Sequence, residues 1–341
     1  MDNVFHSFVI KEAILSEEKN RISEFLKKFD LNYESDITYS IYMEDENGNI
    51  VGTVSLNNYI IKCLAVSAEY QGENLAGELI DNLINKLRSD NKFYYSVYTK
   101  HEYEPLFLSL GFSKIASTDK VSMLEFGSPK IDEVMNRLKV KIESTLDCKL
   151  DDSKVACVVA NANPFTNGHL SLVEEAIYRR YDYIIVFIVQ EDKSYFSEKE
   201  RMALAYVSLL PYDNVVVVPS TRYMVSSMTF PGYFLHDKKL SEWAKIDAII
   251  FRDYFMKKLN IQTRFVGEET DDYMVEYNNI LKETIGEGLV VLDRAKQDDE
   301  IISAKIVRKH LDEGRLEEAL KLVPRGSWVF HTQMYNSKKN K

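Results

Sequence analysis

A run of β-branched residues that ends in a cluster of turn residues constrains the fold of this chain more than any other feature. Val155–Val159 is apolar enough to be a buried strand of a parallel sheet. Residues 161–164 (NANP) then form a turn signal, and Phe165–His169 opens a helix. Gly168 allows a ligand to approach the backbone, and free N–H groups at a helix start attract phosphate. The segment therefore predicts a strand, a phosphate-binding turn and a helix.

The elements that follow continue this alternation. Hydrophobic periodicity predicts a helix over 171–180, a strand over 183–189, a helix over 199–209 and a strand over 215–218. Strands that alternate with helices are typical of parallel βαβ units. In such sheets ligands bind beyond the carboxyl ends of the strands. We therefore expect the second half to be a Rossmann-like α/β domain with its site at that edge.

The first half has a different pattern of short strands and helices. Strands are predicted at Ile37–Met43, Ile50–Asn57, Ile60–Val66 and Phe93–Thr99, and helices at Ala76–Leu87 and Pro105–Leu110. The pattern ends at 127–129 (GSP), after which 131–144 is predicted as an amphipathic helix. We expect domains at 1–130 and 153–335, with 131–152 as a connecting helix and linker.

Composition limits the classes of function. The 341 residues are enough for two domains with their own cores. The net charge of −10 argues against sequence-independent nucleic-acid binding, which depends on Lys and Arg at the phosphates. The three cysteines have the spacing of neither a disulfide framework nor a metal site. With no signal-peptide pattern and no apolar run of membrane-spanning length, a cytoplasmic protein is expected.

Four segments, in order along the second half, resemble the nucleotidyltransferase superfamily of the HUP type. Thr166–His169 (TNGH) resembles the HxGH signature, with threonine in place of the first histidine. Phe196–Arg201 matches the FSxxER segment, Arg264–Glu269 resembles the strand end and loop that hold adenosine, and Ile302–Arg308 resembles the ISxTxxR motif. Each motif alone also fits a surface histidine after a turn or an ordinary capped helix. Four motifs in the order in which the superfamily has them favour a nucleotide-binding domain.

This resemblance implies a nucleotide site built from two helix starts. His169 would donate to a phosphate oxygen, Ser303 would cap the second helix, and Arg308 would clamp the triphosphate. Thr166 and Lys305 stand where the superfamily usually has His and Ser or Thr. The candidate catalytic residues are His169, Thr166 and Arg308, and the candidate ATP-binding residues are Asn161, Asn163, Phe165, Gly168, Gly267, Glu269, Ile302, Ser303 and Lys305.

One family within the superfamily, the [citrate (pro-3S)-lyase] ligases, is resembled most closely. NANPFTNGH, VQEDKSYFSEKER, STRYMVSSMTFPGYF, TRFVGEE, ISAKIVR and LEEALKLVPRG carry the resemblance, and Thr229–Phe234 is its most specific part. The family makes acetyl-AMP from acetate and ATP, releasing pyrophosphate. It then acetylates the thiol of the CoA-like prosthetic group on the acyl carrier subunit of citrate lyase. The resemblance implies an acid–thiol ligase that uses ATP with Mg²⁺ and has acetate and that carrier as partners, with no nucleic acid or membrane.

The first half resembles a GNAT acyltransferase domain. The segments IIKCLAVSAEYQGENLA and LFLSLGF carry this resemblance, which implies a turn that cradles the pyrophosphate of CoA. The corresponding residues are Gln71, Gly72, Asn74 and Ala76, with Asn74 in place of a glycine. Phe107 stands where many GNAT enzymes have a general-acid tyrosine, and a phenyl ring cannot protonate a thiolate. Our hypothesis is that this domain binds the CoA-like arm of the carrier; the alternative is a purely structural domain.

Three other functions remain as alternatives. A cofactor adenylyltransferase would not need the GNAT-like half or the TFPGYF segment. An acetate ligase that modifies tRNA shares the NPFxNGH-type turn, but it does not suit the net charge of −10. A non-catalytic carrier-binding protein with a degenerate nucleotide site is suggested by Thr166 and Lys305.

A few further residues are weaker candidates. Arg222, Ser226 and Ser227 are candidate acetate or carrier contacts, and Lys193 is a candidate triphosphate contact. The remaining histidines share no spacing with carboxylates or cysteines and are interpreted as surface or core residues; they are His6, His101, His236, His310 and His331. The acidic residues at 271–272 and 298–300 are interpreted as solvated loops, with a part in holding Mg²⁺ as the weaker alternative. No metal ligands are predicted.

Overall fold

The computed structural model describes residues 7–70, 72–190, 194–224, 240–297 and 300–339. The chain divides into two compact units. Unit 1 comprises residues 1–130 together with 226–246, and unit 2 comprises 131–225 together with 247–341. No signal in the sequence pattern predicts that the described residues 240–246 belong to unit 1. The finer domain limits stay predictions.

Unit 1 is built on a seven-stranded sheet with the order β1-β2-β3-β4-β5-β7-β6. Neighbouring strands are antiparallel, except that β4 and β5 are parallel and pair only at Ile60↔Ser96 and Ile61↔Val97. Beyond these two residue pairs, β4 and β5 are no longer paired. The strands are β1 (Val9–Glu12), β2 (Tyr39–Glu44), β3 (Ile50–Asn57), β4 (Ile60–Val66), β5 (Tyr94–Lys100), β6 (Ser113–Ser117) and β7 (Val121–Gly127).

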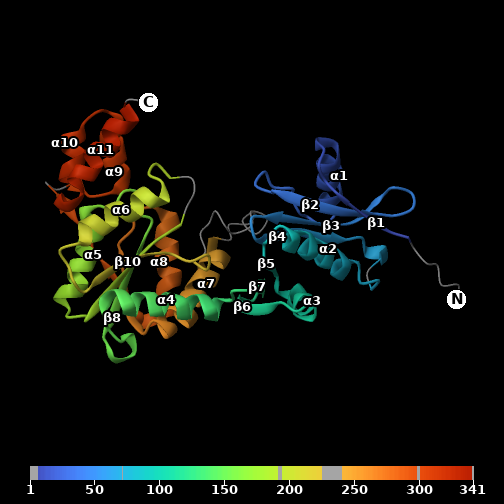
Figure 1. Ribbon diagram of the computed structural model, residues 1–341, viewed down its shortest axis with the longest axis horizontal. Helices are drawn as coiled ribbons and strands as arrows, with labels where there is room; N and C mark the ends of the chain where they lie inside the picture. Colours follow the sequence, from blue (N-terminus) through green and yellow to red (C-terminus); the bar gives the residue numbers. More distant parts are fainter. Residues whose placement is uncertain (1–6, 71, 191–193, 225–239, 298–299, 340–341) are drawn as a thin grey trace. The chain divides into compact units, whose positions relative to one another are not determined.

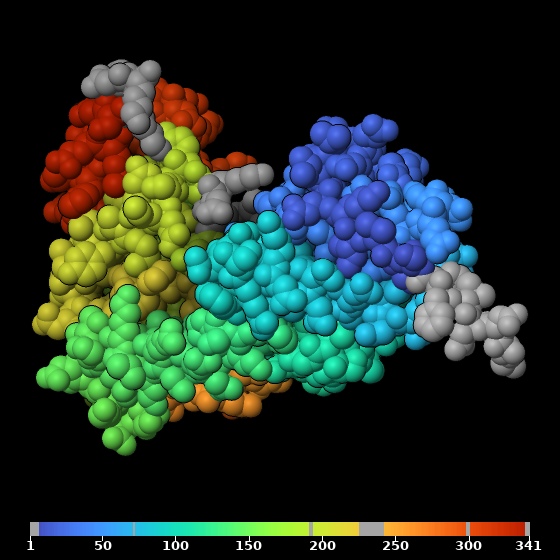
Figure 2. Space-filling model, turned by 45° about the vertical axis from the view of Figure 1, so that its right-hand side comes forward, coloured from blue at the N-terminus to red at the C-terminus, as the bar shows by residue number. Residues whose placement is uncertain are grey.

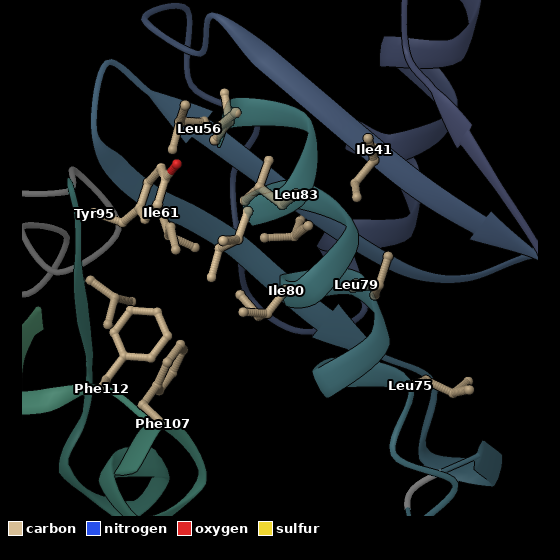
Figure 3. Packing of buried hydrophobic residues seen from close by; sticks show 14 of the residues in the cluster. Ile41, Leu56, Ile61, Leu75, Leu79, Ile80, Leu83, Tyr95, Phe107 and Phe112 are labelled. Carbon is tan, nitrogen blue, oxygen red and sulfur yellow. The ribbon is translucent and has the colours of Figure 1, made fainter. Parts of the chain in front are cut away.

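Helices cover both faces of this sheet. The apolar residues of α2 (Leu75–Ser89) recur at helical spacing, and Leu79, Ile80 and Leu83 point toward the sheet, as Figure 3 shows. On the other face, α1 (Ser16–Lys27) packs Ile22 and Leu26 against the sheet. The short α3 (Glu104–Ser109) adds Phe107 to the α2 side, where its ring lies edge-on to Phe112. Short 3-10 turns η1 (Ala68–Tyr70) and η2 (His101–Tyr103) follow β4 and β5.

Unit 2 is built on a five-stranded sheet with the order β10-β9-β8-β11-β12, in which every pair is parallel. Its strands are β8 (Val155–Ala160), β9 (Tyr183–Ile188), β10 (Val215–Pro219), β11 (Ile261–Gly267) and β12 (Leu289–Leu292). The central strand β8 is almost entirely buried, as its unbroken β-branched sequence predicts. A small hairpin of β13 (Lys296–Gln297) and β14 (Glu300–Ile301) follows.

Both faces of the parallel sheet are covered by helices (Figure 1). Leu172 and Val173 of α5, together with Ala205 and Leu209 of α6, pack on one face. Phe255 of a π-helical turn, η5, packs against Phe187 on the other. The helices of unit 2 up to this point are α4 (Ile131–Leu146), α5 (Asn167–Tyr178), α6 (Glu198–Leu209), η5 (Phe251–Met256) and α8 (Asp272–Ile285), with the 3-10 turns η3 (Leu150–Asp152) and η6 (Gly286–Gly288). Helix α7 (Leu240–Ile250) belongs to unit 1 up to Ile246 and to unit 2 from Asp247.

Three short helices at the end of the chain complete unit 2. They are α9 (Ala304–Asp312), α10 (Leu316–Lys321) and α11 (Trp328–Lys339), with the 3-10 turn η7 (Arg325–Ser327) before the last. Val307 and Leu311 of α9 pack with Phe196 and Leu204 of the α6 region in one buried cluster. In Figure 2 these helices, in red, lie directly against the yellow-green α6 segment. This packing brings the ISAKIVR segment next to α6 and the turn that follows β8.

The predicted elements agree with these bounds in most places. The strands predicted at Ile50–Asn57 and Ile60–Val66 are confirmed residue for residue as β3 and β4. The helix predicted over 171–180 begins earlier, at Asn167, because Thr166 and His169 form a cap that starts it. The parallel sheet and the mixed α+β first half confirm the predicted fold class. No helix in the described ranges is long and apolar enough to cross a membrane.

Candidate functional site

The strand order of unit 2 reverses between β8 and β11. From β8 the chain proceeds through β9 to β10 on one side, and it returns to β11 and β12 on the other. Because β8 and β11 are parallel neighbours, the turn after Ala160 and the loop after Gly267 leave the same edge of the sheet. Loops diverge at such a reversal, and ligands of open α/β sheets bind there. The predicted nucleotide turn therefore lies at the position that the topology favours for a ligand.

Thr166 and His169 are joined at the start of α5. The backbone N–H of Thr166 donates to Nδ1 of His169 at 3.0 Å, and the Thr166 hydroxyl lies 2.9 Å from the same nitrogen. A ring nitrogen that accepts a backbone N–H carries no proton of its own. The hydrogen-bond network therefore assigns the ring proton of a neutral His169 to Nε2. The backbone N–H of Thr166 fixes this tautomer, and the Thr166 hydroxyl lies beside the same nitrogen.

His169 is held as a neutral hydrogen-bond donor. Its ring stacks on fully buried Phe165, with 5.3 Å between ring centroids. Burial lowers the pKa of His169 to about 4, so the ring is uncharged near pH 7. Phe165 was expected among the ATP-binding residues; in the structure its contact is with the histidine.

The backbone N–H groups at this helix start are only partly free. The N–H of Asn167 donates to the carbonyl of Leu322 at 2.9 Å, and the N–H of His169 donates to that of Thr166 at 3.0 Å. The N–H of Gly168 has no acceptor within the described part of the chain. Gly168 therefore offers the backbone donor of this turn for a phosphate oxygen.

The second predicted helix start lies beside the first. A Cβ built on Gly168 would stand 3.5 Å from the carbonyl oxygen of Ile302, an ordinary van der Waals distance, so the two segments lie side by side. Ser303 caps α9 by accepting from the N–H of Ile306 at 3.3 Å. Arg308 of the same helix donates from Nη1 to the carbonyl of Asn163 at 2.5 Å. Lys305 is exposed and forms no ion pair with any described residue. Gly168, Ile302 and Arg308 thus meet around the turn.

Two other residues hold the turn from the α6 side. Nη1 of fully buried Arg201 donates to the carbonyl of Asn161 at 2.7 Å and to its side-chain oxygen at 2.9 Å. The N–H of Phe196 donates to the side-chain oxygen of Asn163 at 3.0 Å. The amide oxygens of Asn161 and Asn163 are therefore used in shaping the turn. The FSxxER match, which contains Phe196 and Arg201, was the sequence signal for these contacts.

The loop after β11 provides the other side of the site. A Cβ built on Gly267 would meet no described atom within 4 Å, so there is open space above the end of this strand. Glu269 pairs with Arg294, which also donates to the carbonyl of Glu268 at 2.7 Å. This pair joins the loops that follow β11 and β12. The space beside Gly267 is where the family resemblance expects adenosine.

No group of three His, Cys, Asp or Glu side chains in the described residues is arranged to hold a metal ion. A Mg²⁺ ion held by the protein therefore does not fit this part of the chain. Mg²⁺ commonly keeps several waters and binds through the phosphates of its nucleotide.

Two histidines, buried His331 and partly exposed His169, make the stability of unit 2 depend on pH. Burial lowers the pKa of His169 and of His331 to about 4, below the value of 6.5 for a free side chain. The unfolded chain therefore binds these protons first, and stability is lost as the pH falls from 6.5 toward 4. We expect urea denaturation to show a loss of about 2 kcal/mol per histidine between pH 7.5 and pH 5. His331→Phe should remove about half of that loss, and an undiminished loss in this variant would contradict the role of His331.

Unit 1 contains a cavity of about 1090 Å³ where β4 and β5 separate. Gly72, Asn74 and Ala76 line it, as expected for a site that takes a CoA-like arm, and Gln71 lies outside the described residues. Asn74 has φ of 59°, the left-handed conformation that glycine would adopt freely. Phe107 is also part of the wall. The turn, α2 and the Phe107 helix thus surround one space.

The weaker candidates receive little support. Lys193, Ser226, Ser227 and the TFPGYF segment lie outside the described residues. Arg222 places its guanidinium 5.4 Å from the ring centroid of Tyr223. The acidic pair near 271 is not merely solvated, since Asp271 caps α8 through the N–H groups of Tyr273 and Met274. The ligand-binding roles of Lys193, Arg222, Ser226 and Ser227 stay predictions, whereas Asp271 has a local structural role as a helix cap.

Each half of the sequence matches the model of a known protein family. The citrate lyase ligase C-terminal domain model matches residues 155–331, and an acetyltransferase (GNAT) domain model matches residues 13–126. The chain is 33% identical over 335 residues to the [citrate [pro-3S]-lyase] ligase of Escherichia coli (strain K12), covering 94% of this chain and 93% of that protein. It is 30% identical over 326 residues to the corresponding ligase of Haemophilus influenzae, covering 92% and 95%.

Among solved structures, a GNAT-family acetyltransferase from Staphylococcus aureus Mu50 matches 36% of this chain and 100% of its own, with 16% identity and a TM-score of 0.30. The ligase model covers more than half of the sequence, and the two ligases align over nearly all of it. The chain therefore belongs to the citrate lyase ligase family.

Proposed function

We propose that this chain activates acetate with ATP and acetylates the thiol of the CoA-like prosthetic group on the acyl carrier subunit of citrate lyase. The observation that carries the proposal is the pair of helix starts at the strand reversal. Thr166 holds His169 at one start, Gly168 lies beside Ile302 of the other, and Arg308 reaches the turn at Asn163. The similarity to citrate lyase ligases over nearly the whole chain supports the choice of acetate and carrier. AMP and pyrophosphate are the other products.

The chemistry of the first step suits these side chains. A carboxylate oxygen of acetate bonds to the α-phosphorus of ATP, the bond from that phosphorus to the bridging oxygen breaks, and pyrophosphate leaves with the electron pair. The protein must position the reactants and stabilise the charge on the phosphate oxygens. The neutral Nε2–H of His169 donates without needing a proton from solution, and Arg308 supplies a fixed positive charge.

Unit 1 has the complementary task of binding the thiol arm. Its cavity is large enough for an extended pantetheine-like chain, and the start of α2 at Asn74 and Ala76 provides a place for the phosphate of the arm. Phe107 in the wall offers no proton for a leaving thiolate. The thiol of the arm accepts the acetyl group and loses a proton, so it needs no general acid at this position.

The first test of the activation step is isotope exchange between ATP and pyrophosphate. Exchange should depend on acetate, because pyrophosphate can re-form ATP only from the acetyl-AMP that acetate makes. Omitting acetate should lower the rate at least tenfold, and propionate and glycine serve as matched carboxylate controls. Exchange that is independent of acetate would contradict the ligase function. With deacetylated citrate lyase added, lyase activity should return, whereas acetylation of tRNA would favour the alternative ligase.

The role of unit 1 can be tested by placing a negative charge in its cavity. Ala76→Glu should raise the KM for the carrier about tenfold, because a carboxylate at the start of α2 repels the phosphate of the arm. The acetate-dependent exchange should not change, since that reaction belongs to unit 2. Ala76→Gln is the matched neutral control. Acetylation of the carrier by the full chain from acetyl-CoA, without ATP, would contradict a role limited to accepting acetyl-AMP.

A further inference from the structure

A hydrogen-bonded chain of three side chains ends at the wall of the unit 1 cavity. Nδ1 of His101 lies 3.2 Å from the hydroxyl oxygen of Ser122, and that hydroxyl lies 2.5 Å from Oε2 of Glu104. His101 lines the cavity and keeps about half of its side chain exposed, whereas Ser122 is fully buried and Glu104 nearly so. Of the three hydrogen-bonded side chains, the imidazole of His101 is therefore the one that a ligand in the cavity can reach.

The proton positions along this chain follow from Glu104. Burial alone would raise its pKa, but hydrogen bonds from Ser122 and Lys114 hold it below the usual value, so the carboxylate is ionised. A carboxylate can only accept, and Ser122 has a single hydroxyl proton to donate to it. The Ser122 oxygen must then accept from His101, which assigns the proton of the neutral ring to Nδ1. Nε2 is left with an unshared electron pair.

The two histidines at the two candidate sites thus have opposite tautomers. Nε2 of His169 is a donor, as phosphate binding needs, and Nε2 of His101 is an acceptor with no partner in the described part of the chain. The charged groups around His101 have mixed signs. Lys114 pairs with Glu104 at 2.9 Å, Lys100 lies near Glu102 at 3.9 Å, and Asp119, Lys120 and Glu242 also line the cavity.

The proposed reaction needs a group that accepts the proton of the carrier thiol. A thiol has a pKa near 8.5, so only a few per cent is ionised near neutral pH, yet the thiolate is the nucleophile. The thiol must lose its proton while a thioester forms. A neutral histidine whose second nitrogen is held by a buried carboxylate through a hydroxyl is suited to take that proton.

We propose that His101 is the general base that deprotonates the thiol of the carrier arm, with Ser122 and Glu104 as positioning residues. This inference rests on the function proposed above. The S–H proton passes to Nε2 of His101 in the unit 1 cavity. The sulfur of the thiolate that forms then bonds to the carbonyl carbon of acetyl-AMP. The bond from that carbon to the phosphate oxygen breaks, and AMP leaves with the electron pair. Ser122 and Glu104 stabilise the imidazolium that forms.

The test measures two reactions on the full chain. Acetate-dependent exchange reports activation, and thioester formation on the carrier subunit reports transfer. His101→Ala should lower the rate constant of transfer about 10²-fold and leave exchange unchanged. In the variant, transfer should rise about tenfold per pH unit, following ionisation of the thiol itself, and added imidazole should restore part of the rate. Glu104→Gln should lower kcat of transfer with little change in KM. His310→Gln, which alters a histidine that contacts Arg315 outside both sites, is the matched control.

The outcomes separate the inference from the function on which it rests. Loss of exchange in the unmodified chain would contradict the ligase function itself. Normal exchange with unchanged transfer in His101→Ala would overturn the role of His101 alone. A transfer defect without imidazole rescue and without the altered pH profile would also overturn it, because it would show a structural effect. If His101→Ala misfolds and therefore loses exchange, His101→Gln takes its place. The transfer rate, its pH profile and the rescue by imidazole are then measured on that variant.

Discussion

Replacing His169 by Asn is expected to lower acetate-dependent ATP–pyrophosphate exchange by about 10²–10³-fold, the usual effect of removing one aligned donor from a charged transition state. The introduced amide oxygen can take the place of Nδ1 and still accept from the N–H of Thr166, so the start of α5 should remain. What disappears is the Nε2–H donor. Exchange is measured at saturating acetate with ATP varied, and kcat should fall more than KM rises.

A glutamine at the same position is the matched comparison. Its side-chain nitrogen reaches roughly as far as Nε2 of the imidazole, so His169→Gln should retain at least tenfold more exchange than His169→Asn. Both variants should unfold within a few degrees of the unmodified chain, because neither enlarges a side chain beside Phe165. If the Asn variant keeps near-normal exchange with unchanged stability, His169 does not contact the reacting phosphate.

The strands and helices around this site were predictable because their sequence patterns are strong. The β-branched run of β8 and the helical spacing in α6 locate these elements within about one residue. The start of α5 at Asn167 lies within Phe165–His169, where the turn motif predicted that a helix opens. Hydrophobic periodicity alone gave 171–180, because it does not detect the cap at Thr166. In unit 1, the hairpin of β6 and β7 and the first helix α1 had weaker patterns and were not predicted.

The sequence predicted which residues belong to the candidate site, but not the contacts that they make with one another. The motifs identified His169 and Arg308, yet only the fold shows Arg308 at the carbonyl of Asn163 and Gly168 beside Ile302. These contacts join residues far apart in the sequence, and no local pattern encodes them. His101 was interpreted as a surface or core residue; its spacing of three from Glu104 was the only available signal, and the joining Ser122 comes from another strand.

Replacing Arg201 by Ala should destabilise unit 2 more than any other single change considered, by about 3–5 kcal/mol. The guanidinium is fully buried, and its Nη1 donates to both oxygens of Asn161 and, at 2.6 Å, to the carbonyl of Val189. Truncation would leave these acceptors unpaired and open a cavity between α6 and the ends of β8 and β9. The midpoint of thermal unfolding should fall by roughly 10 °C.

Activity should respond as well, because Arg201 shapes the turn that carries His169. Arg201→Lys keeps the charge but cannot reproduce the planar set of donors, so we expect an intermediate loss of stability and about a tenfold rise in the KM for ATP in the exchange assay. Arg137→Ala is the matched control, since Arg137 is exposed on α4 and only approaches Glu133 at 3.8 Å. That change should cost less than about 0.5 kcal/mol. An Arg201→Ala chain that melts within two or three degrees of the Arg137→Ala chain would show that the turn is held by other contacts.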